Sequence, residues 1–266
     1  MSGLRQRDEA IRGVAASAWR FRWRVELEAE ARFRRIGDRL EALGAAPGLV
    51  AIARRSASDE HRHAGRCAEL ALDLGADLRE PPPAQAREIA PPGLLPRGRV
   101  LYELVAACCI TETESMGVLT TLLGAARGAP LRSVLRELAS DEVRHSQLGW
   151  AHLGAEHQAG MTAFLGPLIP AMLQGSAPRD LFQPAEGLRD DAVLLEFGVL
   201  PHRLKREVFT RTLEEVVFPG LARFGVDPAP ARSWLDGKRA ACPGVTRRRR
   251  GGARGTLHVL RGGWRS

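Results

Sequence analysis

The sequence has few of the residues that build sheets, membrane spans or secretion signals. It contains one tyrosine among 266 residues and few runs of β-branched residues, whereas Ala, Leu, Arg and Glu are abundant. This bias favours helix over sheet. No run of about 18 apolar residues occurs, so we expect no membrane partner. The first residues, MSGLRQRDEAIRG, lack the apolar core of a signal peptide, and we expect a cytoplasmic location.

Cysteine is also scarce, which argues against a disulfide framework or a zinc site. The chain has Cys67, Cys108, Cys109 and Cys242, with no C-x-x-C spacing and with two of the four adjacent. Disulfide-rich domains and structural zinc sites use more regular spacings. We expect these cysteines to behave as small, buried hydrophobic residues.

Acidic residues are missing from the end of the chain, and this accounts for the net charge of +8. Nine of the 39 Lys and Arg residues follow Asp236, but none of the 31 acidic residues does. Residues 1–236 therefore carry 30 basic and 31 acidic groups. Arg/Gly-rich tails can bind nucleic acid by neutralising phosphates. We expect 237–266 to be a disordered basic tail, and we expect no nucleic-acid partner for the body of the protein.

Glycine and proline divide residues 15–158 into four helical segments. GAAPG at 44–48 separates the first two segments, and RGAP at 127–130 separates the last two. A connector with six prolines, at 78–98, lies between the two pairs. Two helical hairpins joined by one long crossover form a ferritin-like four-helix bundle. The predicted fold class is therefore all-α, a ferritin-like four-helix bundle followed by C-terminal helices.

The segment after the bundle, 159–236, is predicted to be a helical extension. Residues 184–225 carry apolar positions at helical spacing, with a break at 198–201. Two roles fit this segment. It packs on the bundle as a lid, or it forms the contact of a homodimer.

Acidic and imidazole side chains interrupt the apolar stripe of each predicted bundle helix. The heptapeptide ASDEHRH at 57–63 recurs as ASDEVRH at 139–145, and each copy contains a Glu-x-x-His pair on one helix face. The other two helices each carry a single glutamate on the stripe. The interrupting residues are Glu26, Glu60, His63, Glu112, Glu142 and His145.

The spacing predicts that these six side chains lie at one level of the bundle. In each hairpin, the midpoint between the single glutamate and the Glu-x-x-His pair falls at or beside the predicted turn. Four carboxylates buried together are costly unless they take up protons or cations lie among them. Two divalent cations balance four carboxylates with neutral histidines. Oxygen donors with two imidazoles and no thiolate suit iron or manganese.

These motifs resemble those of the ferritin-like di-iron carboxylate superfamily, and in particular a bacterial ferritin-like family with two DE-x-x-H motifs. The family pattern reads E-x6-F…LGAP, DE-x-x-H, C-x-x-E-T, and DE-x-x-H followed by an aromatic residue. LGAAP in this chain is one residue longer than LGAP, which should affect only the turn. The matching residues are Glu26 and Phe33, Asp59, Glu60 and His63, Cys109, Glu112 and Thr113, and Asp141, Glu142, His145 and Trp150.

The resemblance implies a centre of two metal ions, an Fe/Fe pair or, as the alternative, Mn/Fe. Each ion is expected among two glutamates and one histidine, with some carboxylates bridging. The expected ligand sets are Glu26, Glu60 and His63 for one ion, and Glu112, Glu142 and His145 for the other.

The resemblance also gives a role to the aspartate of each repeated heptapeptide. It implies that Asp59 hydrogen-bonds His145 and that Asp141 hydrogen-bonds His63, which fixes the tautomer and orientation of each ring. Without the resemblance, both aspartates would be interpreted as exposed helix charges.

Five further residues near the predicted ligands admit a structural explanation. Arg62 and Arg144 are expected to be surface or ion-pair residues. The small residues Ser56, Cys108 and Ser115 either leave room for a ligand pocket or allow close helix packing.

For function, the resemblance implies that O2 or peroxide is activated at the metal pair to oxidise an unidentified substrate, with an external electron donor. Ferroxidase or iron-handling activity, peroxide scavenging, and a metal-stabilised structural or interaction bundle remain alternatives. Against iron handling, the chain is longer than the bundle alone, and Tyr102 precedes Glu112 by ten residues, roughly 15 Å along a helix. Against peroxide scavenging, no paired-cysteine module is present to supply electrons.

Overall fold

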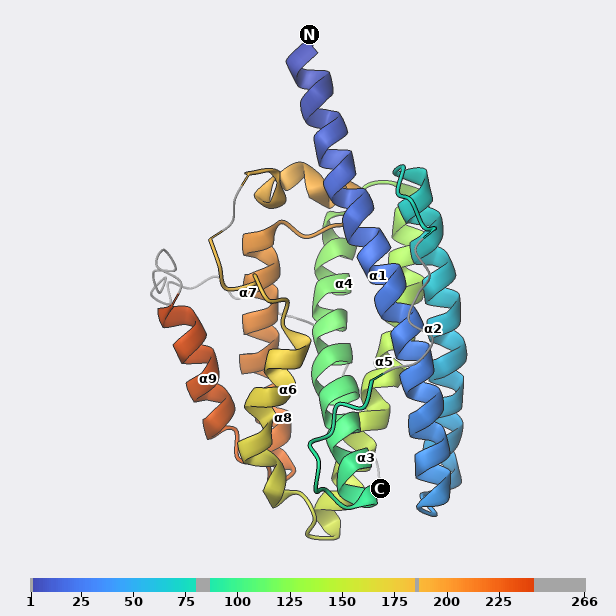
Figure 1. Ribbon diagram of the computed structural model, residues 1–266, viewed down its shortest axis with the longest axis vertical. Coiled ribbons are helices and arrows are strands. Elements are labelled where there is room, and N and C mark those ends of the chain that lie inside the picture. Colours follow the sequence, from blue (N-terminus) through green and yellow to red (C-terminus); the bar gives the residue numbers. More distant parts are fainter. Residues whose placement is uncertain (1, 80–86, 185–186, 242–266) are drawn as a thin grey trace.

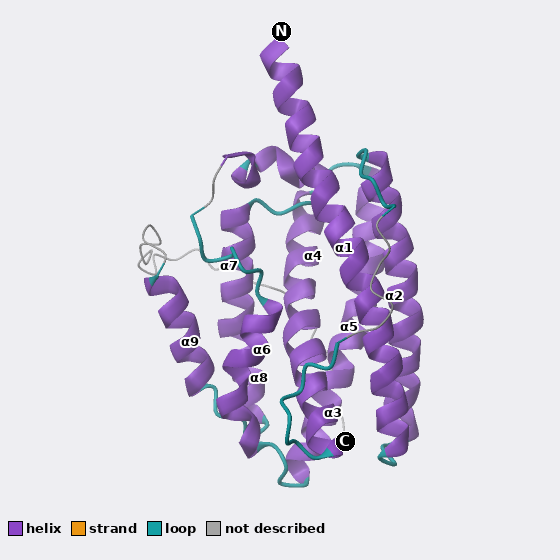
Figure 2. Cartoon of the chain, viewed as in Figure 1, coloured by secondary structure: helices purple, strands orange, loops and turns teal. Residues whose placement is uncertain are grey.

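The computed structural model describes residues 2–79, 87–184 and 187–241, and all regular structure within them is helical (Figures 1 and 2). The all-α prediction is confirmed. Among the described helices, none combines the length and the apolar character needed to cross a membrane. The predictions for Cys242 and for most of the basic tail lie outside the described residues.

Four long helical rods lie side by side in the described part of the chain (Figure 1). The third rod is continuous but changes type, because a π-helical segment, η1, joins two α-helices. The rods are α1 (Ser2–Ala42), α2 (Pro47–Asp73), α3 (Pro96–Leu104) with η1 (Val105–Glu112) and α4 (Thr113–Ala125), and α5 (Ala129–Gln158).

Proline and glycine set the ends of these rods, as the sequence predicts. Pro47, Pro96 and Pro130 lie in the first turn of α2, α3 and α5, where a backbone N–H has no partner within the helix. Gly44 and Gly75 follow α1 and α2 with φ of +67° and +89°. Glycine adopts this left-handed backbone without a steric penalty, so the chain can leave the helix there.

The first and last helices extend beyond the predicted boundaries. α1 begins at Ser2, well before the predicted start of the bundle, and Ile11 packs against Leu194 of the C-terminal segment. Its first turns project past the other rods (Figure 1). α9 (Ala229–Ala240) continues past residue 236, so the predicted basic tail begins inside a helix.

The C-terminal helices cover one side of the third rod (Figure 1). Their apolar side chains form a continuous core with those of α3 and η1. Of the two roles considered for this segment, packing on the rods is the one observed, and the predicted break at 198–201 separates η4 from α7. These elements are η2 (Ala163–Leu168), α6 (Ile169–Ser176), η3 (Gly187–Asp190), η4 (Ala192–Phe197), α7 (His202–Thr212), η5 (Leu213–Val217), α8 (Phe218–Arg223) and α9.

The rods bury two apolar layers with a polar layer between them. Every rod contributes to both apolar layers, so the residues at intermediate sequence positions face the polar layer. One apolar layer includes Phe33, Ala57, Cys108 and Leu148. The other includes Trp19, Cys67, Leu119 and Leu138. The predicted ligands lie between these positions on every rod.

Candidate metal centre

The six predicted ligands meet in the polar layer. α1 contributes one glutamate, the end of η1 contributes another, and α2 and α5 each contribute a Glu-x-x-His pair. No residue of the set exposes more than 7% of its surface. The residues are Glu26, Glu60, His63, Glu112, Glu142 and His145.

Their donor atoms form two groups that share one carboxylate. Within each group, one donor atom from every member lies within 4.8 Å of the others. The groups are Glu26, Glu60 and His63, and Glu60, Glu112, Glu142 and His145. The structure therefore brings the six side chains to one level and places Glu60 in both groups, where a bridging carboxylate would lie.

Glu60 is the residue whose surroundings point most directly to cations. Both of its carboxylate oxygens are buried, and neither accepts a well-aligned hydrogen bond from the described residues. His145 Nδ1 lies 2.9 Å from Glu60 Oε1, and His63 Nδ1 lies 3.3 Å from Glu60 Oε2. A buried carboxylate without directed donors is costly. The arrangement fits a carboxylate and two imidazoles that bind metal ions.

Each histidine faces, on its far side, an aspartate from the opposite helix. Asp141 Oδ2 lies 3.2 Å from His63 Nε2, and Asp59 Oδ2 lies 3.5 Å from His145 Nε2. An aspartate at Nε2 favours a proton there and leaves the Nδ1 lone pair free to bind a cation. The resemblance implies both contacts as hydrogen bonds: the one between Asp141 and His63 is present, whereas Asp59 lies near His145 Nε2 without forming one.

The arginines of the repeated heptapeptide bind the same two aspartates. Arg62 Nη2 donates to Asp141 Oδ2 at 2.5 Å and to Asp59 Oδ1 at 3.1 Å. Arg144 Nη1 donates to Asp59 Oδ2 at 2.7 Å and to Asp141 Oδ1 at 3.2 Å. Both arginines form ion pairs as expected, and each arginine links α2 to α5 because it pairs with the aspartate of its own helix and with that of the other. The repeat thus supplies ligands, the aspartates that orient them, and the cations that hold the aspartates.

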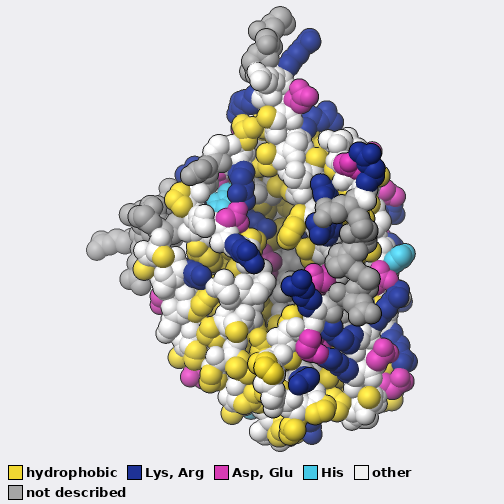
Figure 3. Space-filling view, in the orientation of Figure 1, with side chains coloured by type: hydrophobic (Ala, Val, Ile, Leu, Met, Phe, Trp, Pro, Cys, Tyr) yellow, Lys and Arg dark blue, Asp and Glu magenta, His cyan; other side chains and the backbone are white. Residues whose placement is uncertain are grey.

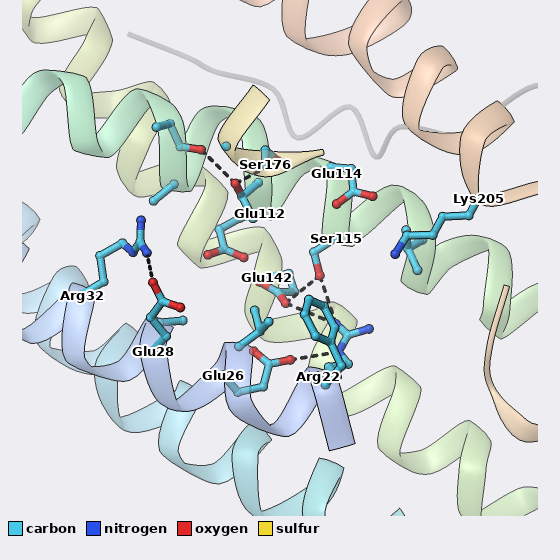
Figure 4. Close-up of a pocket in the computed structure, with 18 of the residues that line it drawn as sticks. Arg22, Glu26, Glu28, Arg32, Glu112, Glu114, Ser115, Glu142, Ser176 and Lys205 are labelled. Atoms are coloured by element: carbon cyan, nitrogen blue, oxygen red, sulfur yellow. Dashed lines mark hydrogen bonds and ion pairs between the residues drawn. The ribbon is translucent and has the colours of Figure 1, made fainter. Parts of the chain in front are cut away.

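Arg22 enters the centre and was not among the predicted residues. Its Nε donates to Glu26 Oε1 at 2.9 Å, and its Nη2 donates to Ser115 Oγ at 3.1 Å (Figure 4). Ser115 in turn donates to Glu142 Oε1 at 3.0 Å. Burial lowers the pKa of Arg22, but the nearby carboxylates outweigh it and raise that pKa, so the guanidinium stays charged. One indication of this contact was present in the sequence, because Arg22 and Glu26 are four residues apart and so lie on the same face of α1.

Burial and mutual repulsion change the proton affinity of the ligands. Both effects raise the pKa of Glu26 to about 8 and the pKa of Glu112 well above its usual range. For the histidines, burial lowers the pKa, but the neighbouring glutamates outweigh it and raise the pKa of His63 to about 9 and that of His145 to about 10. Protons would therefore compete with divalent cations for the same donors.

A cavity of about 740 Å³ adjoins the centre, between α1, η1, α4, α6 and the start of α7 (Figure 4). Glu26, Glu112 and Glu142 form part of its wall, so the centre opens toward this space. Figure 3 shows the molecule hollowed on this face, with apolar side chains in the hollow and Lys and Arg side chains around it. The arrangement gives a small molecule access to one side of the predicted ligands.

The neighbours predicted from sequence divide between cavity wall and helix contact. Ser115 lines the cavity, whereas Cys108 lies against Gly149 where η1 and α5 approach closely. Ser56 is fully buried. Tyr102 was expected to lie far from the centre because it precedes Glu112 by ten residues along the helix. It nevertheless lines the same cavity.

The π-helical segment η1 shapes the cavity and ends in Glu112. Thr111 Oγ1 donates to the carbonyl of Ala106 at 3.0 Å and so satisfies an acceptor in the widened turn. Ala106, Ala107 and Thr111 all line the cavity. A π turn inside an α-helix frequently marks a functional site, because it redirects side chains that a regular helix would place elsewhere.

Comparison of the chain with family models, with curated proteins and with solved structures gave no match. The functional conclusions therefore depend on the residues of the centre and its cavity. What the structure establishes is a buried cluster of glutamates and histidines that can hold metal, open on one side to a cavity.

Proposed function

We propose that the chain is a ferritin-like four-helix bundle whose two-metal carboxylate centre uses O2 or peroxide to oxidise an organic substrate. The observation that carries the proposal is Glu60, buried without directed hydrogen bonds and shared by the two donor groups. The donor set of carboxylates and imidazoles suits iron or manganese. Cys67 Sγ lies 4.0 Å from Glu26 Oε1, but burial raises the pKa of Cys67 and keeps it a neutral thiol.

The side chains would divide the work of the centre. The six ligands would hold the ions, while Asp59 and Asp141 would favour a proton on each Nε2 and orient the rings. The apolar layers above and below exclude water. Held by these residues, a pair of ferrous ions would supply two electrons together to O2 or peroxide. Because the side chains cannot restore those electrons, an external electron donor is part of the proposal.

The cavity favours oxidation of an organic molecule over iron storage. Its volume of about 740 Å³ falls within the range of small-molecule sites in proteins. Much of its wall is apolar, including Val25, Ala29, Met172 and Leu200. Such a surface suits a hydrocarbon body. Of the glutamates in the wall that are not predicted ligands, Glu28 pairs with Arg32, and Glu114 interacts electrostatically with Lys205.

Metal content tests the centre. We expect purified wild-type protein to hold about two metal ions per chain, and Glu60→Ala and Glu142→Ala distinctly fewer, because each substitution removes a donor. Glu69→Ala is the matched control, since Glu69 lies on the same helix as Glu60 with 65% of its side chain exposed. Elemental analysis beside circular dichroism separates lost metal from lost fold. Full metal content in Glu60→Ala would contradict the assignment.

The reaction is tested by loading Fe(II) without O2 and then adding a pulse of O2. Rapid O2 consumption at about two irons per chain, with repeated turnover once a reductant is supplied, supports the oxidase proposal. Growth of a mineral core of many irons would assign the protein to storage. Bound iron that does not react with O2 would assign the centre to stabilisation of the fold.

A further inference from the structure

One lysine in the cavity wall has no ion-pair partner among the described residues. The chain has only two lysines, Lys205 and Lys238, beside its many arginines. Lys205 lies in the first turns of α7, and its ammonium points into the cavity toward Ser115 (Figure 4). Glu114 on α4 interacts with it electrostatically but forms no ion pair with it. An ammonium held in this way is available to an anionic ligand.

The charges around the cavity leave one positive charge uncompensated once two divalent ions are bound. The ions balance the four ligand carboxylates, so Glu26 no longer offsets the charge of Arg22. Arg32 is neutralised by Glu28, whose carboxylate lies 2.8 Å from it. Of the remaining cations, Arg22 and Lys205, Glu114 can offset only one. A ligand with a single negative charge would complete the balance.

Besides Ser115, the uncharged polar residues of the wall are few: Trp19, Tyr102, Thr111 and Ser176. Thr111 Oγ1 donates to the carbonyl of Ala106 and lies 3.2 Å from Ser176 Oγ. The apolar wall extends to the surface, where Phe21 is 62% exposed beside Val25. The cavity therefore has one end that suits an anion, near Arg22 and Lys205, and walls that suit hydrocarbon.

We propose that the cavity binds an organic acid with an apolar body, whose carboxylate lies between Arg22 and Lys205. The proposal rests on the function proposed above and names its class of substrate. Arg22 touches both Glu26 and Ser115, so the carboxylate end of the acid would lie beside the metal centre and the apolar body would extend toward Phe21. Guanidinium and ammonium donors together bind a carboxylate more strongly than neutral donors do.

Binding of paired acids and amides to the Fe(II)-loaded chain, kept free of O2, tests this proposal. The probes are octanoate and 4-phenylbutyrate, each beside its neutral amide, measured by isothermal titration calorimetry. We expect at least one acid to bind about ten-fold tighter than its amide or more. Lys205→Met should abolish this preference, and Lys205→Arg should retain it. The two acids together distinguish an alkyl body from an aryl one.

Lys238→Met is the matched control, because Lys238 lies over the ring of Trp234 and outside the cavity. It should bind both acids as wild type does. Equal affinity for acid and amide, no binding of either acid, or an equal loss in the two Met variants would overturn the proposal. Metal content and O2 consumption, measured on the same samples, keep the two proposals apart. A chain that binds two metals and consumes O2 without preferring acids would overturn the substrate class alone.

Discussion

At the scale of single residues, the centre depends on side chains that position other side chains. Asp59 and Asp141 do not line the cavity, yet each lies against the histidine of the opposite motif and receives both arginines of the repeat. An asparagine has nearly the same shape as an aspartate but can present an N–H to the ring instead of accepting one. The substituted side chain therefore permits the tautomer that would place a proton on the metal-binding nitrogen.

We accordingly expect Asp59→Asn and Asp141→Asn each to lower metal affinity by about 10–100-fold without unfolding the protein. Competition with a chelator of known affinity for Mn(II) measures the change. Asp73→Asn is the control, since Asp73 is an exposed aspartate on the same helix as Asp59. Wild-type affinity in both variants would show that the aspartates only pair with arginine and do not orient the histidines.

At the scale of elements, the contact between η1 and α5 depends on a glycine. A Cβ added at Gly149 would lie 2.6 Å from Cys108 Cβ and 3.0 Å from the backbone nitrogen of Cys109. Neither atom is the end of a flexible side chain, so the helices themselves would have to separate. Because η1 ends in Glu112, the same movement would displace a predicted ligand.

Gly149→Ala should therefore lower the free energy of unfolding by about 1–3 kcal/mol and reduce metal content. Gly65→Ala is the matched control, because Gly65 lies within α2 and a Cβ there meets no atom within 4 Å. Alanine is the better helix former, so this variant should be as stable as wild type or up to about 1 kcal/mol more stable. Urea unfolding measures both. Equal stability of the two variants would contradict the close packing.

The elements also show which parts of the structure could be predicted from sequence. The helix ends near Gly44, Pro47 and Pro130 were predictable because these residues act on the backbone where they stand. The level of the six ligands was predictable because helical periodicity and distance from a turn fix height. The π-helical turn before Glu112 could not be predicted, since no residue type in the sequence marks a shift of backbone hydrogen bonds. The place of Lys205 in the cavity wall could not be predicted either, because only tertiary packing brings α7 to the cavity.

At the scale of the whole molecule, the proposed metal centre predicts a link between bound metal, bound protons and stability. Without a cation, the folded chain holds protons on groups that the unfolded chain releases, because the pKa of Glu26 is raised to about 8, that of His63 to about 9 and that of His145 to about 10. Where the folded state binds more protons than the unfolded state, stability falls as pH rises. Bound cations would replace these protons and remove the dependence.

We expect the chelator-treated protein to unfold at a lower temperature at about pH 9 than at about pH 6, as the raised pKa values are passed. The Mn(II)-loaded protein should unfold at a higher temperature than the treated protein, with the larger difference at about pH 9, where protons compete least. Differential scanning calorimetry at both pH values measures the four midpoints. A chelator-treated chain that is equally stable at both would show that the cluster does not hold these protons.

The crossed contacts between α2 and α5 have a consequence for how the protein matures. The histidine of each hairpin lies against an aspartate of the other hairpin. Neither hairpin alone therefore contains both a histidine ligand and the aspartate that orients it. A nascent chain could not capture an ion tightly until its two halves had docked. Uptake of metal would then mark the end of assembly, and a hairpin prepared in isolation would lack this capacity although it carries three of the six donors.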